Sequence, residues 1–411
     1  MTPSEDLMEE RAERLWKSVA LKEPDRVPIF QCGGGVIPAY SGITYHEFLY
    51  NYDKAREAIV KYLKDFRFDI PMVGAEVGAA GFIFSLAFVD YPEIAPFVRN
   101  IAGPYHDVLG DRYTRFPGRE LGVDEIFQFI GGEFMKPDEY DELIERPKEF
   151  ISGTILPRVC RNLGRTTSPQ SIATLTRLGM EVMKFVEFMR AVSADLAELG
   201  YPNPILGGPY VPLDVIGDFL RDITGILVDL RRYPDKVKQA CTTLLKLVLK
   251  FASSYKPNEP KLLFTPLHLN SYLSPKLYNE FYWPYLKEMI IEVNRQGMKP
   301  FVFFEGNHDA HLETILELPK GWGIAYFEQT DVKKAKKILA GHTCVMGGVP
   351  ASLLISGTPN KIEEHIKKLL EEVKPGGGFI LAVDITMGLT PQTPLENVKA
   401  MIDAVEKYGK Y

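Results

Sequence analysis

Short runs of apolar residues recur along the chain, each followed by a turn and then by a stretch with helical spacing. The runs are nearly continuous in apolar residues and do not alternate with polar ones, which is typical of parallel strands buried on both faces. Eight such strand–helix units predict a (β/α)8 barrel. The predicted strands are residues 27–31, 70–73, 205–208, 262–268, 300–305, 323–328, 343–347 and 379–383.

Several predicted helices begin with a recognisable capping signal, a Ser or Thr followed by Pro at the first helical position. These starts are Ser274-Pro275, Thr358-Pro359 and Thr393-Pro394. After the sixth strand, either Thr330 or Asp331 is expected to cap the next helix. Residues 180–199 and 214–255 carry long apolar stripes, which we interpret as faces packed on the core.

One connection in the predicted barrel is too long for a simple repeat. About 130 residues separate the second and third strands, whereas a barrel repeat needs roughly 30 to 40. We therefore predict an insertion over residues 78–165, with aromatic strands in "RYTRFPG" and "EIFQFIGGEFM". It would lie at the barrel mouth as a lid or a partner-docking surface. No linker divides the chain, so residues 1–411 are expected to form one barrel domain.

The composition narrows the class of protein. Hydrophobic residues make up 45% and charged residues 25%, as in a globular protein, and the net charge of −6 comes with no basic stripe for nucleic acid. The longest apolar run, residues 77–89, is too short to span a bilayer. Four scattered cysteines form no CxxC pair, which favours a reduced, cytoplasmic protein.

In a barrel of this kind, the chemistry occurs at the carboxyl ends of the strands. Polar residues that converge on one mouth form a better pocket than any of them alone. The candidates at the strand ends are Gln31, Cys32, Glu76, Tyr210, Asp214, His268, Asn270, Glu305, Asn307, His308, Glu328, Thr330, Asp384 and Met387.

The segment "FVFFEGNHDAHLE", residues 301–313, carries the strongest local signal. Glu305 follows an apolar run directly, so it is either a carboxylate in the pocket or a polar residue of an ordinary turn. His308 and His311 are three residues apart and would share a helix face, but no third soft ligand stands near them in sequence. Outside this segment, Cys32 fits a small packing residue and Asp214 fits a helix cap.

Four stretches together resemble the uroporphyrinogen decarboxylase superfamily. They are "KEPDRVPIF" at 22–30, "LSPKLYNEFYWPYLKEMI" at 273–290, "DVKKAKKILAGHTCVMGGVPASLL" at 331–354, and the segment from "GTPNKIEEHIKKLL" to "TPLENVKAMIDAV" at 357–405. The resemblance implies a (β/α)8 barrel and three broad activities. These are decarboxylation of a tetrapyrrole, methyl transfer from a corrinoid protein to a thiol, and methyl transfer from a methylated substrate to a corrinoid protein.

Two of these activities lack their family residues here. In the decarboxylases, two arginines after the first strand hold substrate carboxylates, and these positions fall on Gln31 and Gly35. In the thiol methyltransferases, zinc ligands occupy positions that read Phe303, Glu305 and Met387. Unpaired substrate carboxylates and a missing soft ligand set both disfavour these activities, which remain the alternatives.

The resemblance then favours demethylation of a methoxylated aromatic compound, with methyl transfer to the corrinoid (cobalamin) of a separate partner protein. The departing oxygen needs a proton or a Lewis acid, so Glu305 and His268 are the predicted catalytic residues. The same pair is the candidate set for zinc, if zinc takes part. The predicted substrate contacts are Glu76, Tyr210, Phe303, Asn307, Glu328, Asp384 and Met387, within an aromatic mouth that also contains Phe304 and Phe327.

Several points stay open at the level of sequence. Methylamines, methyl thioethers and methanol remain alternative methyl donors. A homodimer is compatible with the family, and a barrel that has lost its chemistry and serves only in assembly is the non-catalytic alternative. Neither a nucleic acid nor a membrane is expected as a partner.

Overall fold

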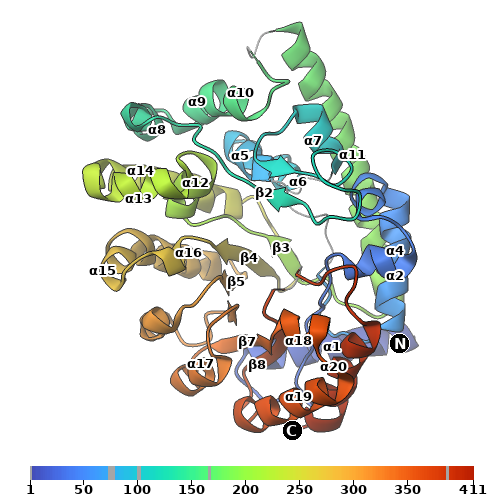
Figure 1. The fold of residues 1–411 in the computed structure, drawn as a ribbon. Coiled ribbons are helices and arrows are strands. Elements are labelled where there is room, and N and C mark those ends of the chain that lie inside the picture. The colour runs from blue at the N-terminus through green and yellow to red at the C-terminus, as the bar shows by residue number, and fades with distance from the viewer. Residues whose placement is uncertain (1, 73–78, 100–102, 165–167, 386–387) are drawn as a thin grey trace.

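The computed structural model describes residues 2–72, 79–99, 103–164, 168–385 and 388–411. Six parallel strands lie side by side in chain order at the centre of the molecule, and helices surround them (Figure 1). The strands are β3 (Ile205–Gly207), β4 (Leu262–Leu267), β5 (Lys299–Phe304), β6 (Ile324–Phe327), β7 (Cys344–Val349) and β8 (Phe379–Val383).

The first two predicted strands continue this sheet as short bridges. Ile29 pairs in parallel with Leu381 of β8, and Phe30 pairs in parallel with Ile70. The strand order therefore runs from β3 to β8 and on through residues 29–30 to residue 70. The predicted (β/α)8 barrel is confirmed, although its first two strands are much shorter than the sequence pattern indicated.

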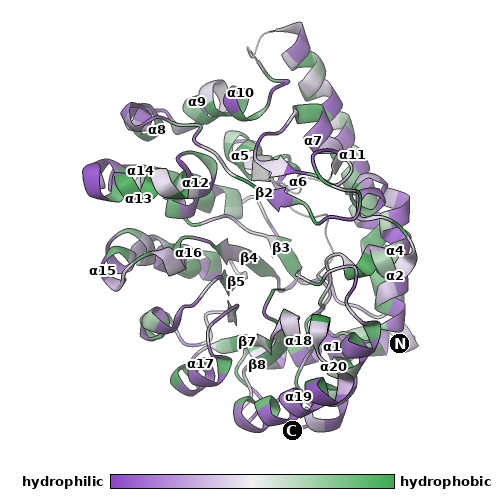
Figure 2. Ribbon diagram, viewed as in Figure 1, coloured by the Kyte–Doolittle hydropathy of each residue, from purple (hydrophilic) through white to green (hydrophobic). Residues whose placement is uncertain are grey.

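The helices of the barrel lie on the outside of this sheet (Figure 1). They are α1 (Pro3–Val19), α2 (Val36–Ser41), α3 (Tyr45–Tyr50), α4 (Tyr52–Asp65), α11 (Pro169–Glu198), α12 (Pro212–Phe219), α13 (Asp222–Arg232), α14 (Pro234–Ala252), α15 (Pro275–Leu277), α16 (Trp283–Arg295), α17 (Val332–Leu339), α18 (Ala351–Ser356), α19 (Pro359–Val373) and α20 (Leu395–Tyr408). Short η segments connect some of them: η3 (Asn270–Tyr272), η4 (Tyr278–Tyr282) and η5 (Asp309–Glu317). In the hydropathy view, the apolar sides of the outer helices turn toward the strands (Figure 2), as amphipathic helices on a buried sheet must.

Two of the predicted capping signals act as side-chain caps. Ser274 Oγ accepts the Leu277 N–H at the start of α15, and Asp331 Oδ1 accepts the Lys333 and Lys334 N–H groups at the start of α17. Asp331, and not Thr330, is therefore the cap of α17. The long stripe predicted over residues 214–255 is three helices, since α12, α13 and α14 are separated by short turns.

Alternate residues of each strand face the barrel interior, as the period of a β-strand requires. The interior cluster includes Phe30, Phe301, Tyr326, Met346 and Ile380, all nearly fully buried. Leu15 and Val19 of α1 belong to the same cluster, so α1 closes the amino end of the barrel. Toward the carboxyl end, the half-buried rings of Phe264 and Phe303 continue the interior rows.

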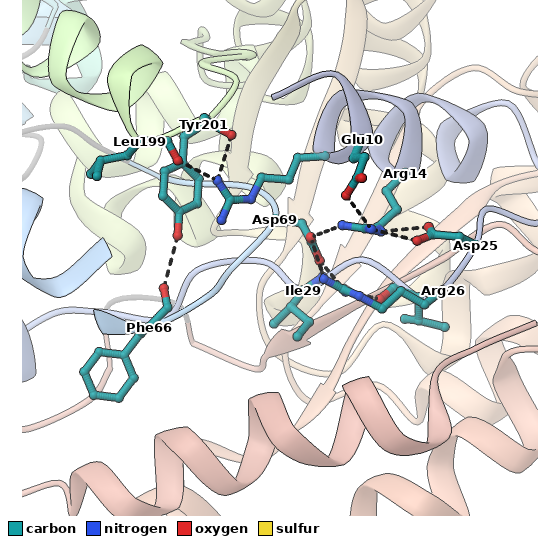
Figure 3. Close-up of polar contacts among 12 residues, drawn as sticks. Glu10, Arg14, Asp25, Arg26, Ile29, Phe66, Asp69, Leu199 and Tyr201 are labelled. Atoms are coloured by element: carbon teal, nitrogen blue, oxygen red, sulfur yellow. Dashed lines mark hydrogen bonds and ion pairs between the residues drawn. The ribbon is translucent and has the colours of Figure 1, made fainter. Parts of the chain in front are cut away.

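A paired network of charges holds the amino end of the barrel together (Figure 3). Asp69 is fully buried and accepts hydrogen bonds from Arg14, Arg26 and the Ile29 N–H, at 2.7–2.9 Å. Arg14 also donates two hydrogen bonds to Asp25. A cavity of about 810 Å³ opens beside this network and is lined by α1, by residues just before the first three barrel strands and by the end of the chain, so it lies at the end opposite the predicted site.

The predicted insertion is mainly helical. It contains α5 (Ala79–Ala87), α6 (Ala95–Val98), α7 (Gly103–Leu109), η1 (Pro137–Glu139), α8 (Tyr140–Glu145), α9 (Pro147–Phe150), η2 (Ile151–Ile155) and α10 (Leu156–Val159). The predicted aromatic strands are reduced to β1 (Thr114–Arg115) and β2 (Gln128–Phe129), which pair antiparallel.

The insertion packs on the chain that follows β3. The ring of Phe82 contacts Tyr210, with 4.8 Å between ring centroids, and the Tyr113 hydroxyl donates to the Phe219 carbonyl. This places part of residues 79–164 beside the carboxyl end of β3. Its role as a lid or docking surface stays a prediction. Within the described ranges, no helix is both long and apolar enough to cross a membrane.

Candidate active site

His268 lies between two carboxylates at the carboxyl end of β4. Its Nδ1 is 2.5 Å from Asp218 Oδ2, and its Nε2 is 3.3 Å from Glu305 Oε1. Asp218 is buried, whereas 26% of the His268 side chain and 36% of the Glu305 side chain are exposed. The imidazole is therefore fixed from the protein side and reachable from the mouth on its Nε2 side.

The electrostatics of this arrangement favour a charged imidazole. Burial alone would lower the pKa of His268, but the negative charges of Asp218 and Glu305 and their hydrogen bonds outweigh it and raise the pKa well above its ordinary value of 6.5. This arrangement favours the doubly protonated imidazole, with one N–H directed to each carboxylate. A proton held in this way is available to an atom that replaces Glu305 at Nε2.

Asp214 supports the site from the same helix as Asp218. The two aspartates are four residues apart on α12, so they lie on one face. Asp214 accepts the N–H groups of His268 and Leu269, at 3.3 and 2.9 Å, and the Tyr282 hydroxyl at 2.6 Å. Complete burial, together with the neighbouring charge of Asp218, raises the pKa of Asp214 to about 7. Asp214 is thus more than a helix cap, because it fixes the backbone that presents His268.

Glu305 reaches the site because of strand alternation. Phe301 and Phe303 face the barrel interior, so Glu305 continues the same row one step beyond β5. The turn behind it is held by two side chains: Asn270 Nδ2 donates to the Glu305 carbonyl at 2.9 Å, and Glu328 Oε2 accepts the Gly306 N–H at 2.5 Å. Gly306 has φ +67°, a conformation that favours glycine.

The aromatic mouth is only partly as predicted. Tyr210 packs edge-on against His268, with 5.3 Å between ring centroids, and the half-buried Phe303 stacks on Tyr326 at 4.3 Å. The prediction was wrong for Phe304 and Phe327, which are fully buried in the cluster between strands and helices. They occupy the opposite parity on their strands, so their rings face away from the pocket.

Other predicted residues serve the turns around the site. Asp384 Oδ1 accepts the N–H groups of Ala351 and Ile385, at 2.8 and 2.7 Å. Asn307 is exposed, and its side-chain oxygen accepts the Asp309 N–H at 2.9 Å. Thr330 is buried, and its Oγ1 accepts the His308 N–H at 2.7 Å. Glu76 and Met387 lie outside the described residues.

His308 and His311 are packing residues in this structure. His308 is fully buried against Phe304, and the ring of His311 stacks on Tyr278 at 4.1 Å between centroids. Burial lowers the pKa of both histidines, which keeps them neutral. Cys32 is likewise buried, beside the Tyr62 hydroxyl.

The donor set at the mouth does not fit a zinc ion. Both ring nitrogens of His268 already contact carboxylates, one of them the buried Asp218, and no cysteine lies beside them among the described residues. Across the part of the chain that the structure describes, no three His, Cys, Asp or Glu side chains group in a way that could hold a metal.

Sequence reasoning missed two residues of this site. Asp218 was not a candidate, although an aspartate four residues after Asp214 in the apolar helix "PLDVIGDF" is a readable signal, since a buried acid needs a partner. Arg99 of the insertion was also missed. Its guanidinium lies over the rings of Phe82 and Tyr210, with its Cζ 5.3 and 5.2 Å from their centroids. No periodic pattern marks it.

A parallel barrel that gathers a histidine and several acids at its carboxyl end belongs to the class of barrel enzymes. A family model described as "Uroporphyrinogen decarboxylase (URO-D)" matches residues 155–408, more than half of the chain. The chain belongs to the uroporphyrinogen decarboxylase family.

Individual relatives are more distant. The uroporphyrinogen decarboxylase of Coxiella burnetii (strain Dugway 5J108-111) is 30% identical over 141 residues, which cover 33% of this chain and 38% of that protein. The enzyme of Pseudoalteromonas atlantica is 28% identical over 140 residues, with the same shares of 33% and 38%. The chain thus spans less than two fifths of the length of these curated relatives.

A solved structure of a methyltransferase from Methanosarcina mazei is similar over nearly the whole chain. The TM-score is 0.62 at 16% sequence identity, and the match covers 96% of this chain and 98% of that one. At this identity the likeness concerns the fold. The residues before 155, which the family model does not reach, are thus included in a fold that another protein shares.

Proposed function

We propose that the protein transfers a methyl group from a methoxylated aromatic compound to the reduced corrinoid of a separate protein. The observation that carries the proposal is the placement of the His268 imidazole between the carboxylates of Asp218 and Glu305, at the carboxyl end of the barrel and beside Tyr210. Such a group protonates an oxygen. Membership of an enzyme family and a fold shared with a methyltransferase are consistent with this reaction and do not identify its substrate.

The proposed reaction breaks the bond between the methyl carbon and the ether oxygen. The electron pair of that bond stays on the oxygen, which becomes a phenolate with a pKa near 10, as for Tyr. His268 Nε2 donates its proton to this oxygen, and Glu305, which faces Nε2, returns a proton from solvent. Positioned proton transfer of this kind contributes about 10²- to 10⁴-fold to a rate.

The barrel supplies the remaining contacts. In this proposal, a flat methoxyarene packs against the exposed part of the half-buried Phe303 ring and against the Tyr210 ring where it borders His268. Asp218 fixes the ring orientation of His268, and Asp214 fixes its backbone. The corrinoid of the partner protein supplies the nucleophile that accepts the methyl carbon, so the partner is a second substrate in this proposal.

The two alternative activities find less support. Gln31 is buried, and its side-chain oxygen accepts the Met72 N–H. At Gly35 there is no room for a side chain, because a Cβ there would lie 2.6 Å from Pro391 Cδ. Neither position offers a basic group to a polycarboxylate tetrapyrrole. Decarboxylation nevertheless stays the second candidate, because the curated relatives are decarboxylases.

The test is methyl transfer itself. Purified protein is incubated with reduced cobalamin and a panel of methoxyarenes, methylamines, methyl thioethers and methanol, and corrinoid methylation is followed by absorbance. A parallel assay offers uroporphyrinogen and measures released CO₂. Methylation with a methoxyarene supports the proposal. Methylation only with another donor class, or CO₂ release without methylation, would overturn it.

A further inference from the structure

We infer that Arg99 binds a carboxylate on the methyl donor, so that the substrates are anionic methoxyarenes. The inference rests on the proposed function and names a substrate class for the same site. Arg99 comes from the insertion, directly after α6, and lies outside the set of residues that sequence reasoning assigned to the pocket.

The position of Arg99 ties the insertion to the site. Its Nε donates to the Gly208 carbonyl at 3.2 Å, one residue beyond β3. Its guanidinium lies over the Tyr210 ring, and the same ring packs against His268. Arg99 and His268 are therefore separated by about the width of one aromatic side chain. Only 8% of Tyr210 is exposed, and the inference places the substrate's benzene ring on that exposed part, with one substituent directed to Arg99 and one to His268.

The charge of Arg99 is buried, and no acid among the residues that the structure describes pairs with it. The residue is only 2% exposed, yet the structure records no ion pair for it among the residues described, and its Nη1 is buried without a hydrogen bond. A buried charge is costly unless it is paired and hydrogen-bonded. The ring faces of Phe82 and Tyr210 offset part of this cost as cation–π contacts.

The other buried arginines show how this protein usually resolves the same problem. Arg14 bonds to Asp25 and Asp69, and Arg221 to Asp229 and Glu133. Arg11 donates to two carbonyls at the end of α11 and lies over the Tyr201 ring. Among the arginines described, Arg99 alone has a buried nitrogen without a partner. Its missing partner is an anion that arrives with the substrate.

The planar guanidinium, with its forked pair of N–H groups, determines which kind of anion it binds best. Two parallel N–H groups match a carboxylate, and hydrogen bonds to a charged group are about twice as strong as neutral ones. A cationic donor, such as a protonated amine, would meet the repulsion of Arg99 and His268. The structure therefore favours aromatic carboxylates over methylamines.

The experiment measures binding and uses no methyl transfer. Titration calorimetry on the wild-type chain compares 3,4-dihydroxybenzoate, catechol and 4-(aminomethyl)catechol, which share a ring and differ in charge. We expect the carboxylate to bind about 10- to 100-fold more tightly than catechol, and the amine to bind no better than catechol. Equal or weaker binding of the carboxylate by the wild-type chain would overturn the inference.

Two variants assign the preference to Arg99. Arg99→Gln keeps a donor toward Gly208 and removes the charge, so its carboxylate and catechol affinities should agree within about 3-fold. Arg115→Leu is the matched control, because Arg115 is an exposed arginine of the same insertion with no ion pair among the contacts described, and it should keep the full preference. Retention of the preference in Arg99→Gln would overturn the inference.

A third variant keeps the test decisive if Arg99→Gln does not fold. Arg99→Lys retains the charge and loses the fork, so carboxylate affinity should fall several-fold while catechol affinity stays unchanged; unchanged carboxylate affinity would contradict the role of the fork. The result is separable from the proposed function. A carboxylate preference without methyl transfer contradicts only the proposed function, and methyl transfer without the preference contradicts only the role of Arg99.

Discussion

Charged side chains gather at both ends of the barrel, but they have their full set of hydrogen-bond partners only at the amino end. At the amino end, the oxygens of Asp69 are occupied by two arginines and a backbone N–H, and Arg14 bonds to two acids (Figure 3). At the carboxyl end, His268 faces Glu305 at 3.3 Å with both groups partly exposed, and buried atoms of Arg99 and Asn270 lack partners.

This difference separates stability from chemistry. A buried ion that has all of its hydrogen bonds resists change, because removing any partner leaves an uncompensated charge. A charged group with one open side retains the capacity to bind or donate elsewhere. One end of the barrel is therefore closed and fixed, and the other is left available for binding and proton transfer.

The largest expected effect is at the open end. Replacing both groups, as His268→Gln with Glu305→Gln, removes the proton and its acceptor, and methyl transfer should fall by about 10²- to 10⁴-fold. The unfolding midpoint should fall as well, because the buried Asp218 loses its imidazole partner, so the transfer rate is compared for the folded fraction. Transfer assays and thermal unfolding on the same sample measure the two quantities. Full transfer activity in the double variant would remove these residues from the mechanism.

At the closed end, we expect the opposite pattern. Asp69→Ala leaves Arg14, Arg26 and the Ile29 N–H without their acceptor, which should cost about 3–5 kcal/mol of unfolding free energy. Urea denaturation provides the measurement. The folded fraction should transfer methyl groups at the wild-type rate, and a variant of normal stability and reduced rate would contradict the division between the two ends.

The pH dependence of transfer tests the charge on His268. Because its folded-state pKa lies well above 6.5, the His268 proton is lost only as pH rises, so activity should decline on the alkaline side. Asp218→Asn removes one raising charge and should move this decline to lower pH, with about 1.4 kcal/mol for each pH unit. Asp309→Asn is the control, since Asp309 pairs with Lys334.

Stability follows the same titration. The folded state binds the His268 proton more tightly than the unfolded state does, so this contribution is fully present below about pH 6.5 and disappears as pH rises through the folded pKa. Unfolding free energies measured from neutral to alkaline pH should show a smaller decline in Asp218→Asn than in the wild-type chain. An identical decline in both would mean that Asp218 does not raise this pKa.

The smallest effect concerns a polar residue at the open end that serves structure alone. Asp331 caps α17 through the Lys333 and Lys334 N–H groups, so Asp331→Ala should cost about 1 kcal/mol of unfolding free energy. Methyl transfer should stay unchanged. Loss of transfer in this variant would show that the open end is more tightly coupled than its contacts indicate.

The strand ends were readable from sequence because burial on both faces leaves long apolar runs, and such runs end where the chain meets solvent. Glu305 and His268 follow this rule, and the structure brings their side chains together. Because these runs are continuous in apolar residues, the sequence does not show which residues face the barrel interior and which face the helices. This is why Phe304 and Phe327 were assigned to the mouth although they pack under the helices.

The remaining parts of the site depend on contacts distant in sequence. Asp218 meets His268 across 50 residues, and Arg99 meets Gly208 across 109. No local period or capping pattern encodes such a meeting, since it depends on how the insertion and α12 pack on the barrel. The helix starts were predicted to within about a residue because caps are local. Ser274 and Asp331 act as side-chain caps, whereas Thr358 makes no capping hydrogen bond and α20 begins after Pro394 and not after Thr393.

Leu15 and Val19 of α1 close the amino end of the barrel, and this closure has a kinetic consequence. A barrel closed at one end has a single entrance, so a small donor and a partner protein that both need the mouth must use it in turn. In the proposed reaction, the donor would have to enter before the partner covers the opening, and the demethylated product would leave only after the partner departs. Steady-state rates should then show a compulsory order of addition, with the partner protein inhibiting at high concentration.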